Sequence, residues 1–175
     1  MPIVDEIKFN HSWSHDDKSA KIKSIYLASR QYRQVWSGTA LLHISEWWEL
    51  QETLPWYLAI LRQSFRLKYA DDEGVFGPGI YSTPNSSKAD VYAKNHYVSS
   101  NLHAMLICYV VATKPQRKLL ADHSITRPSS GYNCIEGVTI DNGGSLQYPE
   151  FVVYREDAII PVGLIMYTRK GWEPL

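Results

Sequence analysis

The chain has no excess of either charge, few cysteines and no long apolar run, and each absence excludes a class of protein. Lys and Arg together number 18, as do Asp and Glu, so the net charge of the 175 residues is zero. Proteins that bind duplex nucleic acids normally carry a basic excess, so nucleic acid is not the expected partner. No apolar stretch approaches the roughly 20 residues of a membrane-spanning helix, and the first ten residues do not resemble a signal peptide. We therefore expect an intracellular protein, cytoplasmic or nuclear, without a membrane partner.

The cysteines and histidines are too few and too scattered to predict a disulfide framework or a metal centre. The two cysteines are Cys108 and Cys134, whereas a disulfide-stapled fold needs several pairs. Cys108 lies within an apolar run and is expected to be a buried free thiol, while Cys134 lies beside a turn. No histidine or second cysteine stands at metal-ligand spacing from either of them. We therefore expect neither a structural zinc nor a metal cofactor.

Aromatic side chains are abundant, with six Trp and twelve Tyr in a chain that is 45% hydrophobic. Rings of this kind line the core of a globular domain, and they also form platforms for sugars and bases. Composition alone does not choose between these roles. The length fits one domain, and no segment resembles a linker, so we expect a single domain over residues 1–175.

Apolar spacing and capping signals predict helices mainly in the first half of the chain. Ser14 and Ser87 are candidate helix caps, and Pro55 suits the first position of a helix. The expected helices cover residues 14–32, two segments within 45–65, and 87–95, with a short strand over 33–39.

Strands are expected mainly in the second half. Residues 104–112 form a near-continuous apolar run that is short enough for a buried strand. Further strands are expected over 134–140, 150–154 and 158–167. Helices followed by strands, without regular alternation, predict an α+β fold.

The segment FGPGIY, residues 76–81, suggests a binding site. Gly77 and Gly79 would let the backbone approach a ligand closely. Tyr81 and Tyr92, on the next expected helix, could clamp a flat ring between them. Glu150 follows Pro149, which marks the start of a strand, and an acid there could project from the sheet rim into a cleft. The alternative for this residue is a solvated glutamate at a strand end.

Six sequence blocks occur in a fixed order around these residues. They are WSGT (36–39), FGPGIY (76–81), SKADVY (87–92), GYNCI (131–135), LQYPEFVVY (146–154) and PVGLIMY (161–167). In this order, over roughly residues 30–168, they resemble the catalytic domain of the poly(ADP-ribose) polymerase-like ADP-ribosyltransferases. The chain is most similar to small stand-alone members of the kind found in fungi.

The resemblance implies a fold and a reaction. The fold would be that of the ADP-ribosyltransferases, with two packed, mostly antiparallel sheets forming a split β core flanked by helices. The substrate would be NAD, whose nicotinamide–ribose bond is cleaved through an oxocarbenium-like state. ADP-ribose would then pass to a protein, a small molecule or water.

The resemblance also assigns roles to residues at the expected site. Glu150 would hold the ribose hydroxyls and stabilise the developing cation. Gly38 would anchor the carboxamide through its backbone, and Tyr81 and Tyr92 would enclose the nicotinamide ring. Thr39, Gly79 and Ser87 would also line the NAD site.

Two positions depart from the family pattern. Ser37 stands where the family's His-Tyr-Glu triad has histidine, so the triad here would be Ser37, Tyr81 and Glu150. Ala89 stands where many members have a serine that hydrogen-bonds the carboxamide. Each departure removes a neutral polar contact of roughly 0.5–1.5 kcal/mol. A catalytically altered or inactive protein that binds a nucleotide-like ligand, or that acts on another substrate in the same cleft, is therefore the alternative hypothesis.

Overall fold

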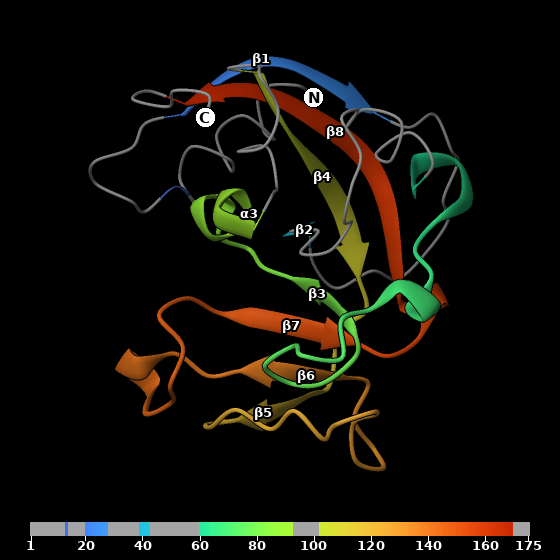
Figure 1. Cartoon of the computed structure of the whole chain (residues 1–175), viewed down its shortest axis with the longest axis vertical. Coiled ribbons are helices and arrows are strands. Elements are labelled where there is room, and N and C mark those ends of the chain that lie inside the picture. Colours follow the sequence, from blue (N-terminus) through green and yellow to red (C-terminus); the bar gives the residue numbers. More distant parts are fainter. Residues whose placement is uncertain (1–12, 14–19, 28–38, 43–59, 93–101, 170–175) are drawn as a thin grey trace.

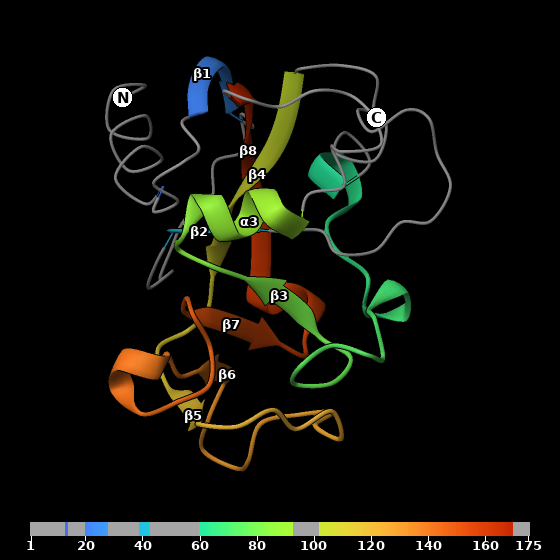
Figure 2. The ribbon, with the colours of Figure 1, turned by 60° about the vertical axis from the view of Figure 1, so that its left-hand side comes forward.

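The computed structural model describes residues 13, 20–27, 39–42, 60–92 and 102–169. Within these residues the fold consists mainly of strands, arranged in two four-stranded sheets with few helices. Figures 1 and 2 show one sheet above the other, with a short helix, α3, beside the upper sheet and above β3. The coarse prediction of an α+β fold with two mostly antiparallel sheets is confirmed.

The upper sheet has the strand order β1-β8-β4-β2. Its strands are β1 (Ala20–Leu27), β2 (Thr39–Leu42), β4 (Leu102–Val110) and β8 (Ile159–Arg169). All neighbouring strands in this sheet are antiparallel. β4 and β8 lie at its centre and are its longest strands, so they carry most of its interior.

The lower sheet has the order β3-β7-β6-β5, and its strands are short. They are β3 (Ile80–Ser82), β5 (Pro115–Lys118), β6 (Cys134–Gly137) and β7 (Glu150–Val153). β3 and β6 pair antiparallel with β7, whereas β5 and β6 are parallel. The described helical elements are α3 (Ser86–Tyr92), residues 60–63 and three 3-10 turns, Leu67–Tyr69, Ile140–Asn142 and Glu156–Ala158.

Alternation along the strands divides the core into three clusters. In β4, Leu106 and Cys108 face a central cluster that also contains Ile80 and Val153 of the lower sheet. The residues between them face the opposite way, because successive strand side chains point to opposite faces. Met105 and Ile107 of β4 therefore belong to a second cluster, which also contains Ala89 of α3 and Ile165 and Tyr167 of β8. A third cluster, on the far face of the lower sheet, consists of Phe76, Tyr81, Ile125, Ile135 and Val152. Burial of both faces of β4 explains why its sequence reads as a continuous apolar run.

The helix predicted over residues 14–32 is wrong where the structure describes it, because residues 20–27 form strand β1. Ile22 and Ile25 lie three residues apart, as on one face of a helix. The pairing of β1 with β8 shifts register between Ile22 and Ser24. A β-bulge of this kind changes the alternation of side chains, so both isoleucines pack against the cluster beside α3. The bulge therefore produced the helix-like spacing.

The remaining boundaries differ from the predictions by a few residues. α3 is confirmed, but its cap is Asn85, whose Oδ1 accepts the Lys88 N–H at 2.8 Å. Ser87, the predicted cap, lies inside the first turn.

The predicted strands correspond to β4, β6, β7 and β8, and both cysteines are buried free thiols. The predicted strand over 33–38, residues 45–59 of the predicted helical segment, and the end of the helix at Asn95 lie outside the described residues. None of the described helices has the length and apolarity to cross a membrane.

Candidate functional site

Tyr81 and Glu150 lie on the same face of the lower sheet. Tyr81 of β3 pairs with Val152 of β7, and both side chains pack in the third cluster. Glu150 stands two residues before Val152 on the same strand, and residues two apart share a face. The two sequence blocks that contain Tyr81 and Glu150 are therefore brought together by the β3–β7 pairing.

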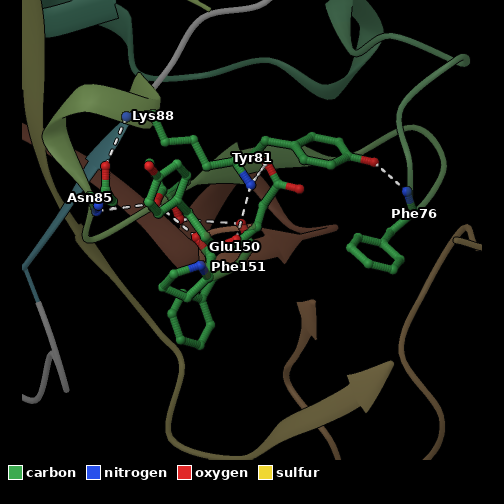
Figure 3. A network of polar contacts seen from close by, with 10 residues as sticks. Phe76, Tyr81, Asn85, Lys88, Glu150 and Phe151 are labelled. Atoms are coloured by element: carbon green, nitrogen blue, oxygen red, sulfur yellow. Dashed lines mark hydrogen bonds and ion pairs between the residues drawn. The ribbon is translucent and has the colours of Figure 1, made fainter. Parts of the chain in front are cut away.

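Helix α3 adds Lys88 and Tyr92 to this face. Residues four apart lie one above the other on a helix, so both point to the same side of α3. The Lys88 Nζ lies 3.2 Å from Glu150 Oε1 and donates to the Tyr148 carbonyl at 3.3 Å. Burial, and then the charge of Glu150, raise the pKa of the Tyr92 phenol above its usual value. Lys88, Tyr81 and Glu150 thus converge from three elements (Figure 3).

The ion pair between Lys88 and Glu150 is buried. Glu150 is only 3% exposed and Lys88 only 7% exposed. The alternative of a solvated strand-end glutamate is therefore wrong. A buried charge is tolerated when a partner compensates it, and Lys88 is that partner. The sequence signal for Lys88 was its position four residues before Tyr92, on the same helical face.

The Tyr81 hydroxyl is held by the turn that precedes its strand. It accepts the Phe76 N–H at 2.8 Å and donates to the Gly77 carbonyl at 2.7 Å. The hydroxyl of Tyr154 donates to the Phe76 carbonyl, so two tyrosines fix the same turn. Burial is the main cause that raises the pKa of Tyr81 well above its usual value, and nearby charges, including Glu150, raise it further. Tyr81 therefore contributes a fixed aromatic ring rather than a proton donor.

The glycines of the FGPGIY segment have packing reasons of their own. A Cβ on Gly79 would lie 2.4 Å from Val152 Cγ1, on the neighbouring strand. Gly77 has φ +74°, and a Cβ there would lie 2.0 Å from the Ile125 carbonyl oxygen. Glycine tolerates both situations because it has no side chain. Close approach of the chain to itself is enough to explain this pair.

The other predicted binding residues differ in how far the structure describes them. Ser37 and Gly38 lie outside the described residues. Thr39 begins β2, which runs beside α3 and β3, and its backbone pairs with Tyr109. The Ser87 hydroxyl is buried and donates to Asn85 Oδ1 at 2.8 Å, so part of its hydrogen bonding serves the start of α3. Tyr92 is 43% exposed and is the open edge of the site.

Ala89 is fully buried and packs against the upper sheet in the cluster that contains Met105, Ile107 and Ile165. Its methyl group therefore faces apolar side chains. A serine at this position would place a hydroxyl among them. Alanine thus suits the way this helix packs.

No protein-family model matches the chain. Among the described residues, no three His, Cys, Asp or Glu side chains gather as metal ligands. A hollow of about 330 Å³ lies elsewhere, between residues 61–66 and the start of β8. It contains none of the predicted site residues. The candidate site is the Glu150 cluster because Lys88 and Glu150 form a buried ion pair there beside Tyr81.

Proposed function

We propose that the protein is an ADP-ribosyltransferase-like enzyme that binds NAD and cleaves the bond between nicotinamide and ribose. The single observation that carries the proposal is the buried carboxylate of Glu150 near Tyr81 and Tyr92, three residues that belong to three sequence blocks of the family pattern. The two sheets, one with β4 and β8 at its centre and one with β7, are compatible with the split β core of the ADP-ribosyltransferase fold. ADP-ribose would be transferred to a protein, a small molecule or water.

The chemistry of Glu150 suits this reaction. Cleavage of the nicotinamide–ribose bond develops positive charge on the ribose. A fixed carboxylate in a water-poor site stabilises such charge more strongly than it would in water. Lys88 compensates the carboxylate before substrate binds, and it also anchors Glu150 to α3. The carboxylate therefore keeps its position without support from solvent.

The aromatic groups suit a planar leaving group. The Tyr81 ring is held at its hydroxyl end by the turn at residues 76–77, so it loses little freedom when a ligand stacks on it. Tyr92 is partly exposed at the end of α3 and could close over the other face of the ring. Gly38, Thr39 and Ser37 would complete the carboxamide and ribose contacts, as the resemblance implies.

The direct experiment measures nicotinamide released from NAD by the wild-type protein and by Glu150→Gln. We expect the variant to lose about 10²–10³-fold in rate, the typical effect of removing one preorganised electrostatic contact. Glu136→Gln is the matched control, because Glu136 lies on the neighbouring strand β6 and pairs only loosely with Arg117 at 3.8 Å. Release that is no faster than in buffer, and equal in all three proteins, would disprove the proposed reaction.

A second candidate is a module that binds a nucleotide-like ligand without turnover. Two observations favour it: Lys88 neutralises Glu150, and Ala89 presents a methyl group to the core where many members of the family have a serine. Ser37 in place of the triad histidine points the same way. Calorimetric titration with NAD, ADP-ribose and nicotinamide distinguishes the candidates. Tight binding without nicotinamide release would support the module, whereas absence of any binding would exclude both functions.

A further inference from the structure

A second buried charge cluster lies on the opposite side of α3 from Lys88. The Asp90 carboxylate accepts the Tyr167 hydroxyl at 2.7 Å and pairs with Arg169 Nη1 at 2.6 Å. His103 Nδ1 lies 3.7 Å from the same carboxylate. Asp90 and His103 are almost completely buried, and the Arg169 side chain is only 11% exposed. This cluster joins α3 to the two central strands of the upper sheet, β4 and β8.

The two ion pairs act on opposite sides of one short helix. Successive residues of an α-helix are rotated by about 100°, so Lys88 and Asp90 point roughly 200° apart. Lys88 holds the lower sheet through Glu150, and Asp90 holds the upper sheet through Arg169. Figures 1 and 2 show α3 beside the strands of the upper sheet and above β3 of the lower sheet. The seven-residue helix is therefore braced from both sides.

The apolar surroundings of Asp90 show that α3 could pack on the upper sheet without the charge of this residue. Neighbouring contacts between α3 and the upper sheet are apolar, through Ala89, Met105 and Ile165. A buried ion pair is often no more stabilising than well-packed apolar side chains of the same volume. The ion pair instead restricts the orientation of α3, because a carboxylate bound by both a guanidinium and a hydroxyl can adopt few geometries. Rotation or sliding of α3 would break these bonds, whereas apolar contacts alone would tolerate it.

We propose that Asp90 is a positioning residue: by fixing α3 on β8, it holds Lys88 and Tyr92 in place at Glu150. The proposal rests on the proposed function for its effect on turnover, but not for its effect on the helix. Asp90 itself lies on the far side of α3 and takes no part in bond cleavage. Its contribution is to set the position of Lys88, which anchors Glu150, and of Tyr92.

The first experiment compares Asp90→Asn with Asp141→Asn, a matched change at an exposed aspartate of the lower sheet's 3-10 turn. We expect Asp90→Asn to lower kcat/KM for nicotinamide release by about ten- to hundredfold, the scale of a small misplacement of catalytic groups. Asp141→Asn should remain within about twofold of the wild type. Because Asp90→Asn leaves Arg169 buried without its charge partner, Asp90→Asn/Arg169→Met is measured as well. A return to wild-type activity in this double variant would overturn the proposal, since the loss would then come from the unpaired cation.

A double-mutant cycle tests whether Asp90 acts through Lys88. If it does, Asp90→Asn should lower activity much less in a Lys88→Met background than in the wild type, because the positioned group is already absent. Equal losses in the two backgrounds would show that Asp90 acts independently of Lys88 and would contradict the proposal. Folding of each variant is followed by thermal unfolding, and an Asp90→Asn variant that does not fold is replaced by the same variant with Arg169→Met.

A measurement without NAD separates the proposal from the proposed function. The Tyr92 phenol is titrated by NMR of ¹³C-labelled tyrosine, with Tyr92→Phe to assign the signal. In the wild type its pKa is raised by burial and by Glu150. If Asp90 positions α3, Asp90→Asn/Arg169→Met should lower this pKa toward its ordinary value, and an unchanged titration would overturn the proposal. If the wild type releases no nicotinamide but the Tyr92 pKa shifts in the double variant, the reaction is disproved and the positioning role is supported.

Discussion

The β4–β8 pair of the upper sheet and the β3–β7 pair of the lower sheet differ in length and in what they bury. β4 and β8 have nine and eleven residues, and the buried residues of β4 are apolar except for His103. β3 and β7 have three and four residues, yet they bury Tyr81, Ser82 and Glu150. The long pair buries mainly apolar side chains, and the short pair holds polar side chains in the interior of the protein.

The difference predicts how each region responds to substitution. Apolar packing loses stability in proportion to the volume removed. A buried polar group depends on one or two named partners, so removing a partner leaves the other group unsatisfied. Truncating apolar side chains of the upper sheet should therefore lower stability without changing the chemistry of the site. Substituting the buried polar residues of the lower sheet should change both. The following variants test this contrast.

The largest effect is expected for Lys88→Met, which removes the charge partner of Glu150. Breaking a buried ion pair from one side typically costs about 3–5 kcal/mol, because the remaining charge is uncompensated. We expect a loss of this size in the free energy of unfolding from urea titration. The lysine stem is replaced by a side chain of similar length, so packing changes little.

The reference for this variant is Lys88→Met/Glu150→Gln, which removes both charges and should recover most of the lost stability. Glu136→Gln breaks the partly exposed pair with Arg117 and should change stability by only about 0–1 kcal/mol. A double variant as unstable as Lys88→Met alone would show that the charge of Glu150 is not what the lysine compensates.

A slightly smaller effect is expected in the upper sheet from Leu106→Ala. Leu106 is fully buried in the central cluster, and such truncations cost about 2–5 kcal/mol. Unfolding measurements should show this loss, while calorimetric affinity for any nucleotide ligand stays unchanged below the unfolding temperature. A large change in ligand affinity would mean that the two regions are not separable.

Tyr81→Phe should cost about 1–3 kcal/mol, because the buried Phe76 N–H loses its hydrogen-bond acceptor. The aromatic ring remains, so stacking on a planar ligand should be retained. Tyr154→Phe is the matched control, since Tyr154 donates to the carbonyl of the same residue. Equal stability of Tyr81→Phe and the wild type would show that the turn does not depend on this hydroxyl.

The smallest effect at neutral pH concerns the two buried thiols, one in each sheet. Burial raises the pKa of Cys134 from 9.0 to about 11, and burial raises the pKa of Cys108 further. A raised pKa means that the folded state holds the proton more tightly than the unfolded state. The thiols thus contribute full stability below pH 9, and this stability is lost as pH rises through the folded pKa.

The measurement compares the pH dependence of unfolding free energy for the wild type and Cys134→Ala. We expect a less steep decline in the variant between pH 9 and about pH 11. The cavity left by alanine lowers stability equally at every pH, so only the slope is informative. Parallel curves for the two proteins would contradict a raised thiol pKa in the folded state.

Much of the fold was predictable where the local sequence determines the element. The apolar run around Leu106 predicted β4, because a strand buried on both faces needs no alternation. Pro149 correctly predicted the start of β7. The helix over residues 14–32 failed because a bulge between Ile22 and Ser24 imitates helical spacing, and the bulge depends on pairing with β8, about 140 residues away.

The candidate site was only partly predictable for a similar reason. The convergence of Tyr81 and Glu150 follows the sequence blocks, although which face of the sheet they share depends on register. Lys88 and Asp90 were missed as site-forming residues because a charged residue on a short helix is normally solvated. Their partners, Glu150 and Arg169, are distant in sequence, so only the contacts of α3 with both sheets reveal that both charges are buried.

The strand order also determines how this chain can fold during its synthesis. Thr168 of β8 hydrogen-bonds Lys21 of β1, which lies 147 residues earlier in the sequence. Ser82 of β3 hydrogen-bonds Phe151 of β7, 69 residues later. A ribosome releases the chain from its first residue, so β1 and β3 emerge long before the strands that complete their hydrogen bonds. Contacts this distant in sequence form slowly and leave strand edges exposed to other chains. Folding of both sheets must therefore follow release of the last quarter of the chain, and truncation before β7 and β8 would remove the partners of both sheets together.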